Sequence, residues 1–159
     1  HINYMFLMNS KIEFIKKTIA VNPFNNDYFC WFDFSLPYIF KNMESSLAKL
    51  KKYSESEFIY EPFIAMPGCW NKCANVDVLK DFICWRFCGG FFIGDKNSLL
   101  SFYDVSIARF EEFLNLTKKL VWEVNYWAWL ELMGYTSFMW YLADHNDSII
   151  NVPIDVIQN

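Results

Sequence analysis

The sequence has few of the residues that interrupt a packed core or build common catalytic motifs. Its 159 residues include five glycines, five prolines and two histidines. Because no linker rich in proline, serine or glycine is present, we expect one domain over residues 1–159. There is no G-x-G-x-x-G sequence and no P-loop. With His1 and His145 as the two histidines, neither a Cys–His nor a Ser–His–Asp triad is well supported.

Basic residues are not in excess, and no secretory signal is visible. Lysine and arginine number 14 against 18 acidic residues, for a net charge of −4, which gives no electrostatic case for nucleic acid. The most membrane-like stretch, residues 125–143, contains Glu131 and is interrupted at residues 134–137. A helix, a turn and a strand explain it better than a transmembrane span. We therefore expect a cytoplasmic location, or one at the cytoplasmic face of a membrane.

Aromatic and other hydrophobic residues are abundant, and this predicts a thick, aromatic-filled interior. They make up 21% and 54% of the chain. The five cysteines are Cys30, Cys69, Cys73, Cys84 and Cys88. Four of them form two C-x3-C pairs, a spacing that differs from the usual C-x2-C or C-x4-C of structural zinc sites. Buried free thiols in a reducing compartment are the simpler interpretation.

Segments with strand-like and helix-like patterns alternate along the chain. We expect strands within residues 28–34, 57–66, 82–94 and 137–143, and helices over 10–21, 38–52, 98–116 and 121–133. We expect residues 2–8 to form a strand or a core segment, and residues 148–159 to form a short apolar tail. Pro62 predicts that the middle of the strand 57–66 is an edge strand or a bend. This alternation predicts an α/β fold with a mixed, mainly parallel sheet flanked by helices.

The first predicted helix has an N-terminal signal and one apolar face. Ser10 and Glu13 have capping-box spacing, and the isoleucines at 12, 15 and 19 share a face with the lysines opposite. For the helix over residues 98–116 we expect Ser98 to be the cap.

Two candidate sites lie at the ends of predicted strands. Asp33 and Ser35 follow an aromatic strand, where a carboxylate can bind a divalent cation, or can cap the next turn. Gly89 and Gly90 let the backbone approach a ligand closely, or form a β-bulge. In an open α/β sheet ligands bind beyond the carboxyl ends of strands, which favours the functional interpretation of Asp33.

Two further clusters lie later in the chain. Glu123 lies among tryptophans, Trp122 and Trp127, whose indole faces suit sugar rings; it can serve as a base, or can be an exposed first-turn glutamate. His145, within residues 143–148, has carboxylates around it and can complete a metal site or contact a diphosphate, or can belong to a polar turn.

The order of these clusters resembles nucleotide-sugar glycosyltransferases of the GT-A type and, more narrowly, the HtrL/YibB family of bacterial glycosyltransferase-like proteins. The matching stretches are KIEFIKKTIAVNPFNNDYFCWFDFSL, GGFFIGDKNSLLSFYD, WEVNYWAWLE and DHNDSII. The resemblance implies that Asp33 and His145 hold a divalent metal, Mn²⁺ or Mg²⁺, with Ser35 in place of the second carboxylate of a D-x-D motif. It also implies that Gly89 and Gly90 line the donor or acceptor, and that Glu123 faces the reacting sugar.

The resemblance implies a glycosyltransferase that moves a sugar from a nucleotide-sugar donor to a glycan acceptor in polysaccharide biosynthesis. It also implies that the chain is the larger C-terminal part of a longer protein, without the N-terminal nucleotide-binding strand. The serine at position 35 motivates an alternative, a non-catalytic carbohydrate-binding domain with the same fold. The surplus of aromatic residues motivates another, a structural or assembly domain.

Overall fold

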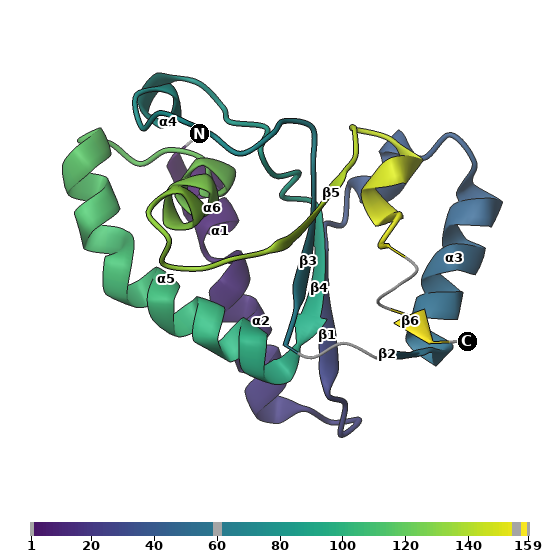
Figure 1. Cartoon of the computed structure of the whole chain (residues 1–159). Helices are drawn as coiled ribbons and strands as arrows, with labels where there is room; N and C mark the ends of the chain where they lie inside the picture. Colours follow the sequence, from purple (N-terminus) through teal and green to yellow (C-terminus); the bar gives the residue numbers. More distant parts are fainter. Residues whose placement is uncertain (1, 59–61, 154–156, 159) are drawn as a thin grey trace.

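The computed structural model describes residues 2–58, 62–153 and 157–158 (Figure 1). Helices α1 (Ile2–Asn9) and α2 (Lys11–Val21) precede strand β1 (Tyr28–Phe32), the 3-10 helix η1 (Leu36–Ile39) and helix α3 (Met43–Glu55). The following elements are β2 (Glu57–Phe58), β3 (Ile64–Gly68), α4 (Val78–Asp81), β4 (Phe91–Asp95) and α5 (Lys96–Thr117). The last are α6 (Glu123–Leu132), β5 (Met139–Leu142), η2 (Asp147–Ile150) and β6 (Ile157–Gln158).

The protein has an α/β fold with a mixed four-stranded sheet in the order β1-β4-β3-β5. The pairs β1–β4 and β3–β4 are antiparallel, and β3–β5 is parallel. A mainly parallel sheet was therefore the wrong prediction. The connection from β3 to β4, residues 69–90, carries the short helix α4 and returns the chain antiparallel beside β3. Strands β2 and β6 form a separate antiparallel pair.

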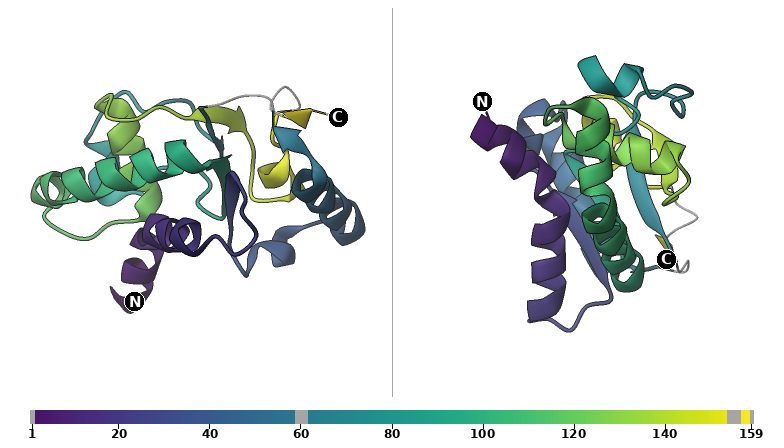
Figure 2. Two further views of the ribbon diagram at one scale, coloured as in Figure 1. Left: turned by 90° about the horizontal axis from the view of Figure 1, so that it is seen from below. Right: turned by 90° about the vertical axis from the view of Figure 1, so that its left-hand side faces the viewer.

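Both faces of the sheet are covered. Helices α1, α2, α5 and α6 lie on one side, and α3 lies with η2 on the other (Figures 1 and 2). Side chains along the strands alternate between the two faces. Met66 and Phe92 belong to the core that α1, α2, α5 and α6 cover, and Ala65 and Phe91 belong to the core on the side of α3 and η2. Because both faces are buried, β4 is apolar almost throughout rather than alternating between apolar and polar residues.

Helix α6 packs against α1, α4 and α5, and every residue from Glu123 to Glu131 is buried. Glu131 is paired with Arg86, whose Nε and Nη2 each donate to one of its carboxylate oxygens at 2.8 Å. The Trp140 ring lies 4.6 Å from the Arg86 guanidinium carbon. The pairing allows a carboxylate within a stretch of aromatic residues.

The predicted helix, turn and strand over residues 125–143 are present, with Gly134 in the left-handed region at φ 74°. None of the helices in the described part of the chain is both long and apolar enough to cross a membrane.

Several local predictions need correction. Residues 2–8 are helical, and α1 leads almost directly into α2. Ser10 therefore makes no capping box; its hydroxyl donates to the Phe6 carbonyl at 2.8 Å. Asp95, not Ser98, caps α5, since its carboxylate accepts a hydrogen bond from the Ser98 amide at 2.9 Å. Residues 82–90 are irregular rather than extended. Parts of the predicted strand 57–66 and of the predicted tail, residues 59–61, 154–156 and 159, lie outside the described residues.

Asp147 ties the segment after β5 to the start of α3. Its carboxylate accepts hydrogen bonds from Ser46 Oγ at 2.7 Å and from the amides of Lys41 and Asn42 at 2.8 and 3.2 Å. The hydrogen bond from Ser46, aided by these amides, lowers the pKa of Asp147 to about 2. The ordinary value in an unfolded chain is about 3.9. The contribution to stability is therefore complete above pH ~4 and is lost as the pH falls through about 2.

We expect Asp147→Asn to lower the free energy of unfolding at neutral pH, with the difference from wild type shrinking as the pH approaches 2. Urea denaturation across this pH range measures it. Asp104→Asn, an exposed change on α5, is the matched control. A difference for Asp147→Asn that is constant with pH would contradict this account.

Candidate functional site

A pocket of about 250 Å³ opens beside the end of β1 and the start of β4. Side chains and backbone from α1, α2, α6, the segment after β1, the segment before β4 and the segment after β5 line it. Its polar and small residues are Lys11, Asp33, Ser35, Cys88, Gly89, Gly90, Glu123 and His145. A second pocket, of about 270 Å³, lies near β1 and α3 with Asp27 as its one charged residue. The first pocket therefore holds far more chemically reactive groups.

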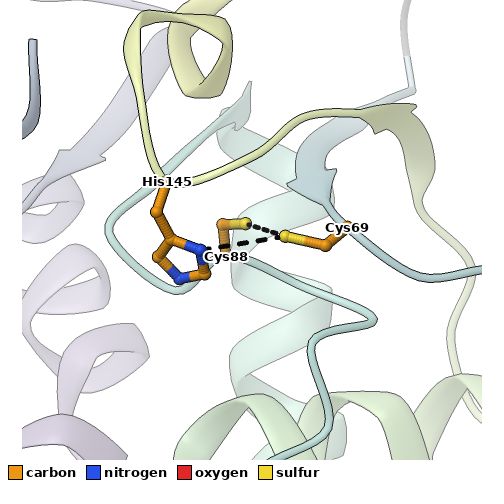
Figure 3. A group of neighbouring side chains, drawn as sticks. All are labelled: Cys69, Cys88 and His145. Carbon is orange, nitrogen blue, oxygen red and sulfur yellow. Dashed lines mark hydrogen bonds between the residues drawn. The ribbon is translucent and has the colours of Figure 1, made fainter.

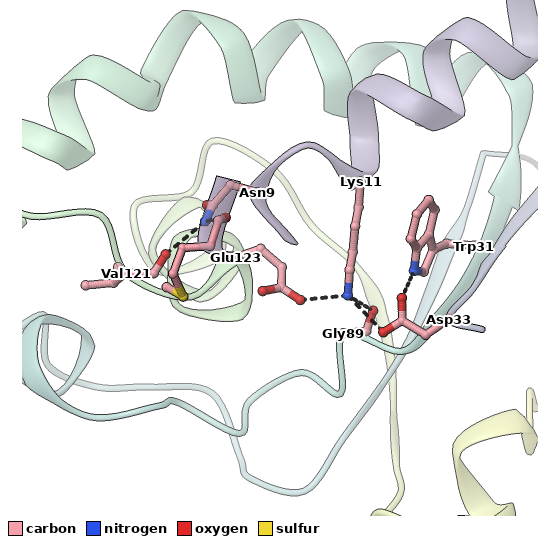
Figure 4. A network of polar contacts seen from close by, with 8 residues as sticks. Asn9, Lys11, Trp31, Asp33, Gly89, Val121 and Glu123 are labelled. Carbon is pink, nitrogen blue, oxygen red and sulfur yellow. Dashed lines mark hydrogen bonds and ion pairs between the residues drawn. The ribbon is translucent and has the colours of Figure 1, made fainter. Parts of the chain in front are cut away.

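Lys11 is the centre of the polar network in this pocket (Figure 4). Its side chain is 1% exposed, although it carries a charge. The ammonium nitrogen lies 2.8 Å from Glu123 Oε1, 3.1 Å from Asp33 Oδ2 and 2.8 Å from the Gly89 carbonyl oxygen. These three acceptors match the three protons of the ammonium group, as a buried cation requires.

Asp33 follows β1 directly and continues its pairing with the neighbouring strand. Its amide donates to the Gly90 carbonyl at 2.8 Å. Its Oδ1 accepts a hydrogen bond from Trp31 Nε1 at 2.7 Å, and its Oδ2 contacts Lys11. The turn after Asp33 is closed by its main-chain carbonyl, which accepts from the Leu36 amide at 2.9 Å. The carboxylate thus faces the network rather than capping that turn.

Glu123 is the first residue of α6, where a negative charge is favoured by the helix dipole. Unlike an ordinary first-turn glutamate it is buried, at 4% exposure. One carboxylate oxygen, Oε1, is held by Lys11, and Oε2 is buried with no hydrogen-bond partner among the described residues. Asn9 helps to position Glu123: its amide nitrogen donates to the Met5 and Val121 carbonyls, both at 2.9 Å, and so joins α1 to the segment before α6.

Of the two glycines, Gly89 is the one that the close approach of Glu123 requires. A β-carbon at position 89 would collide with Glu123 Oε1, which contacts Lys11. At Gly90 the nearest atom would be Leu36 Cδ1, at 3.1 Å and at the end of a flexible side chain.

We expect Gly89→Ala to lower the free energy of unfolding by about 1–3 kcal/mol, the usual range for overpacking, because it pushes Glu123 away from Lys11. Gly90→Ala, the matched control, should have a smaller effect because Leu36 can move. Urea denaturation of both variants measures the difference, and an equal or larger loss in Gly90→Ala would contradict the arrangement.

Most of the predicted site residues come together at this pocket. Those that line it are Asp33, Ser35, Gly89, Gly90, Trp122, Glu123 and His145. Trp122 also packs edge-on against Tyr4, with ring centroids 5.8 Å apart. Trp127, also predicted to bind the ligand, does not line this pocket: it is buried between Phe92 and Phe102, at centroid distances of 5.6 and 6.0 Å. The helix turns it into the core, whereas Glu123 faces the pocket.

A divalent-metal cofactor stays a prediction, and the groups around Asp33 do not fit it. The Lys11 ammonium already lies 3.1 Å from this carboxylate and would repel a second cation. His145 Nδ1 lies 3.5 Å from Asp144 Oδ1 and 3.9 Å from Cys69 Sγ, so this ring nitrogen is engaged within another cluster.

Lys11 itself was missed, because the lysines of this helix were predicted to lie opposite its apolar face. Lys17 does so and pairs with Glu13 at 2.8 Å. Lys11, however, lies four residues before Ile15 and eight before Ile19, which places it on the apolar face. Helical periodicity alone therefore indicated that Lys11 lies on the buried face, but a charged residue at the start of a helix is usually expected to be exposed to solvent.

The chain belongs to the HtrL/YibB family of bacterial proteins of unknown function, whose family model matches residues 1–121. The match covers Lys11, Asp33, Gly89 and Gly90, and Glu123 follows shortly after it. No curated protein matches the chain, and no solved structure matches it. The family is thus established, and its description indicates no activity.

Proposed function

We propose that the protein is a glycosyltransferase with a GT-A-like fold, which moves a sugar from a nucleotide-sugar donor to a glycan acceptor. The single observation that carries the proposal is Glu123. It is a buried carboxylate in a pocket wall, with one oxygen held by Lys11 and the other without a partner among the described residues. A buried acceptor that stays unsatisfied is costly, and a ligand hydroxyl would satisfy it.

In this proposal Glu123 is the general base. An acceptor hydroxyl gives its proton to Oε2 as its oxygen attacks the anomeric carbon of the donor sugar. The bond from that carbon to the diphosphate oxygen breaks, and the diphosphate leaves with the electron pair. Lys11 orients the carboxylate through Oε1 and leaves Oε2 without a hydrogen-bond partner among the described residues.

The walls of the pocket support a sugar as the ligand. Tyr4, Trp85 and Trp122 offer aromatic surface, on which the C–H faces of sugar rings stack. Two carboxylates share the one ammonium of Lys11, so the wall keeps negative charge. This favours a neutral hydroxylated group here, and in the proposal the diphosphate of the donor binds away from Asp33 and Glu123. A polysaccharide precursor at the cytoplasmic face of a membrane is the acceptor class that we propose.

A second candidate function is a non-catalytic carbohydrate-binding or assembly domain. Two exposed aromatic side chains next to the pocket-lining residues favour it: Phe34 is 97% exposed and Tyr38 is 89% exposed. Aromatic surface of this kind can contact a glycan or a partner protein.

The test is release of nucleoside diphosphate by the full-length protein from a panel of nucleotide sugars with glycan acceptors. The proposal predicts release with at least one donor. Saturable binding of a glycan without release from any donor would favour the second candidate. If the protein showed neither release of nucleoside diphosphate nor donor binding by calorimetry, the transferase proposal would be ruled out.

A further inference from the structure

Two thiols and an imidazole converge where β3 and β5 end, beside the proposed sugar pocket (Figure 3). Cys69 follows β3, Cys88 precedes the glycine pair, and His145 follows β5. The Cys69 and Cys88 sulfurs are 3.5 Å apart, and Cys69 Sγ lies 3.9 Å from His145 Nδ1. All three ligand atoms lie within 4.8 Å of one another, and no other group of three such donors occurs in residues 2–58, 62–153 and 157–158.

Backbone hydrogen bonds hold the three donors in place. The Cys88 amide donates to the Pro67 carbonyl at 2.8 Å, and the Cys69 amide donates to the Trp85 carbonyl at 2.9 Å. The segment that carries His145 follows β5, which is held by its parallel pairing with β3. The His145 ring packs edge-on against the Trp85 ring, with ring centroids 4.4 Å apart. The cluster is therefore part of the folded framework.

The spacing fits a tetrahedral metal. With Zn–S bonds of about 2.3 Å and Zn–N bonds of about 2.0 Å, tetrahedral angles place two sulfurs about 3.8 Å apart and a sulfur and a nitrogen about 3.5 Å apart. The observed distances, 3.5 and 3.9 Å, differ from these by a few tenths of an ångström. Asp144 Oδ1 lies 3.9 Å from Cys69 Sγ and 3.5 Å from His145 Nδ1, so a carboxylate is next to two of the three donors.

We infer that Cys69, Cys88 and His145 form a zinc site, with the fourth position left to a water molecule. Thiolate and imidazole ligands suit Zn²⁺ rather than Mg²⁺ or Mn²⁺. The two sulfur ligands come from different C-x3-C pairs, so the spacing within each pair says nothing against the metal. Bound zinc would tie β3, β5 and the segment before Gly89 together, and so stiffen one rim of the pocket. The inference does not depend on the proposed transferase activity.

The remaining cysteines supply the controls. Cys73 and Cys84 form a separate thiol pair, with their sulfurs 2.7 Å apart. Cys30 lies exposed on β1. Substituting Cys30 or Cys73 should leave the proposed zinc site intact, whereas substituting Cys69 or the exposed His145 removes a ligand.

The test is a Co²⁺ titration of the full-length protein, reduced and stripped of metal, followed by competition with Zn²⁺. We expect one Co²⁺ per chain, with thiolate charge-transfer absorption and the intense visible bands of tetrahedral cobalt, and displacement by Zn²⁺. Cys69→Ser and His145→Gln should each weaken binding by more than about tenfold, the least effect that loss of an outer-shell partner has. Cys30→Ser and Cys73→Ser should bind as wild type does.

Three results would overturn the inference. The first is no uptake of Co²⁺ by the reduced wild-type protein. The second is binding that Cys73→Ser abolishes and that Cys69→Ser and His145→Gln leave intact, which would place the metal at the other thiol pair. The third is a disulfide between Cys69 and Cys88 that remains after the protein has been treated with a reductant, as shown by mass spectrometry after thiol alkylation.

Discussion

Lys11→Met is expected to lower the free energy of unfolding by about 3–5 kcal/mol, the range for removing one partner of a buried ion pair. The side chain is 1% exposed and contacts two carboxylates and a carbonyl. Methionine has similar length and no charge, so the variant keeps much of the packing but leaves Asp33 and Glu123 facing each other without a cation. Urea denaturation at neutral pH measures the loss.

Two further variants separate the charge effect from a general effect of changing this helix. Lys17→Met alters an exposed lysine of α2 and should change the unfolding free energy by less than about 0.5 kcal/mol. Adding Asp33→Asn and Glu123→Gln to Lys11→Met removes the uncompensated charges and should restore part of the loss, so that the three changes are not additive. A loss below about 1 kcal/mol in Lys11→Met would mean that the buried network does little for stability.

Glu123→Gln is expected to reduce transferase turnover by about 10²–10⁴-fold, the usual contribution of a general base. Glutamine has nearly the same shape, and its carbonyl oxygen can still accept the hydrogen bond from Lys11, so the fold should persist. Glycan affinity should change little, because the base acts mainly in the transition state. The measurement is the rate of nucleoside diphosphate release, with circular dichroism to confirm folding.

Asp33→Asn is the matched control, because Asp33 contacts the same ammonium but has both carboxylate oxygens engaged. Its effect on turnover should be clearly smaller than that of Glu123→Gln. If Glu123→Gln retained wild-type turnover, Glu123 would not be the base. If Asp33→Asn were the more damaging change, the catalytic carboxylate would be Asp33.

The sequence predicted the position of Asp33 and Glu123 well because each depends on local pattern. An aromatic strand followed by Ser35-Leu36-Pro37 places a carboxylate at a strand end, and a helix that starts at Glu123 places another in its first turn. Strand direction was not predictable in the same way. Whether β4 runs parallel or antiparallel to β3 depends on how residues 69–90 pack, and alternation of helices and strands carries little information on that.

The buried position of Lys11 could not be predicted from the residues near it in the sequence. Lys11 is buried because carboxylates from two distant segments, 22 and 112 residues away in the chain, meet at its ammonium group. The three residues are too far apart in the sequence for a local pattern to connect them. The thiol cluster is similar: Cys69 and Cys88 are brought together by pairing of backbone segments, and their C-x3-C spacing pointed to the wrong partners.

A crystal structure of the full-length Glu123→Gln protein with a nucleotide sugar and a glycan acceptor tests the central claim most directly. The account predicts a sugar ring in the pocket lined by Lys11 and Trp122, with an acceptor hydroxyl within hydrogen-bond distance of the side chain at position 123. A sugar bound instead in the pocket near β1 and α3, with the Lys11 pocket filled by water alone, would contradict it.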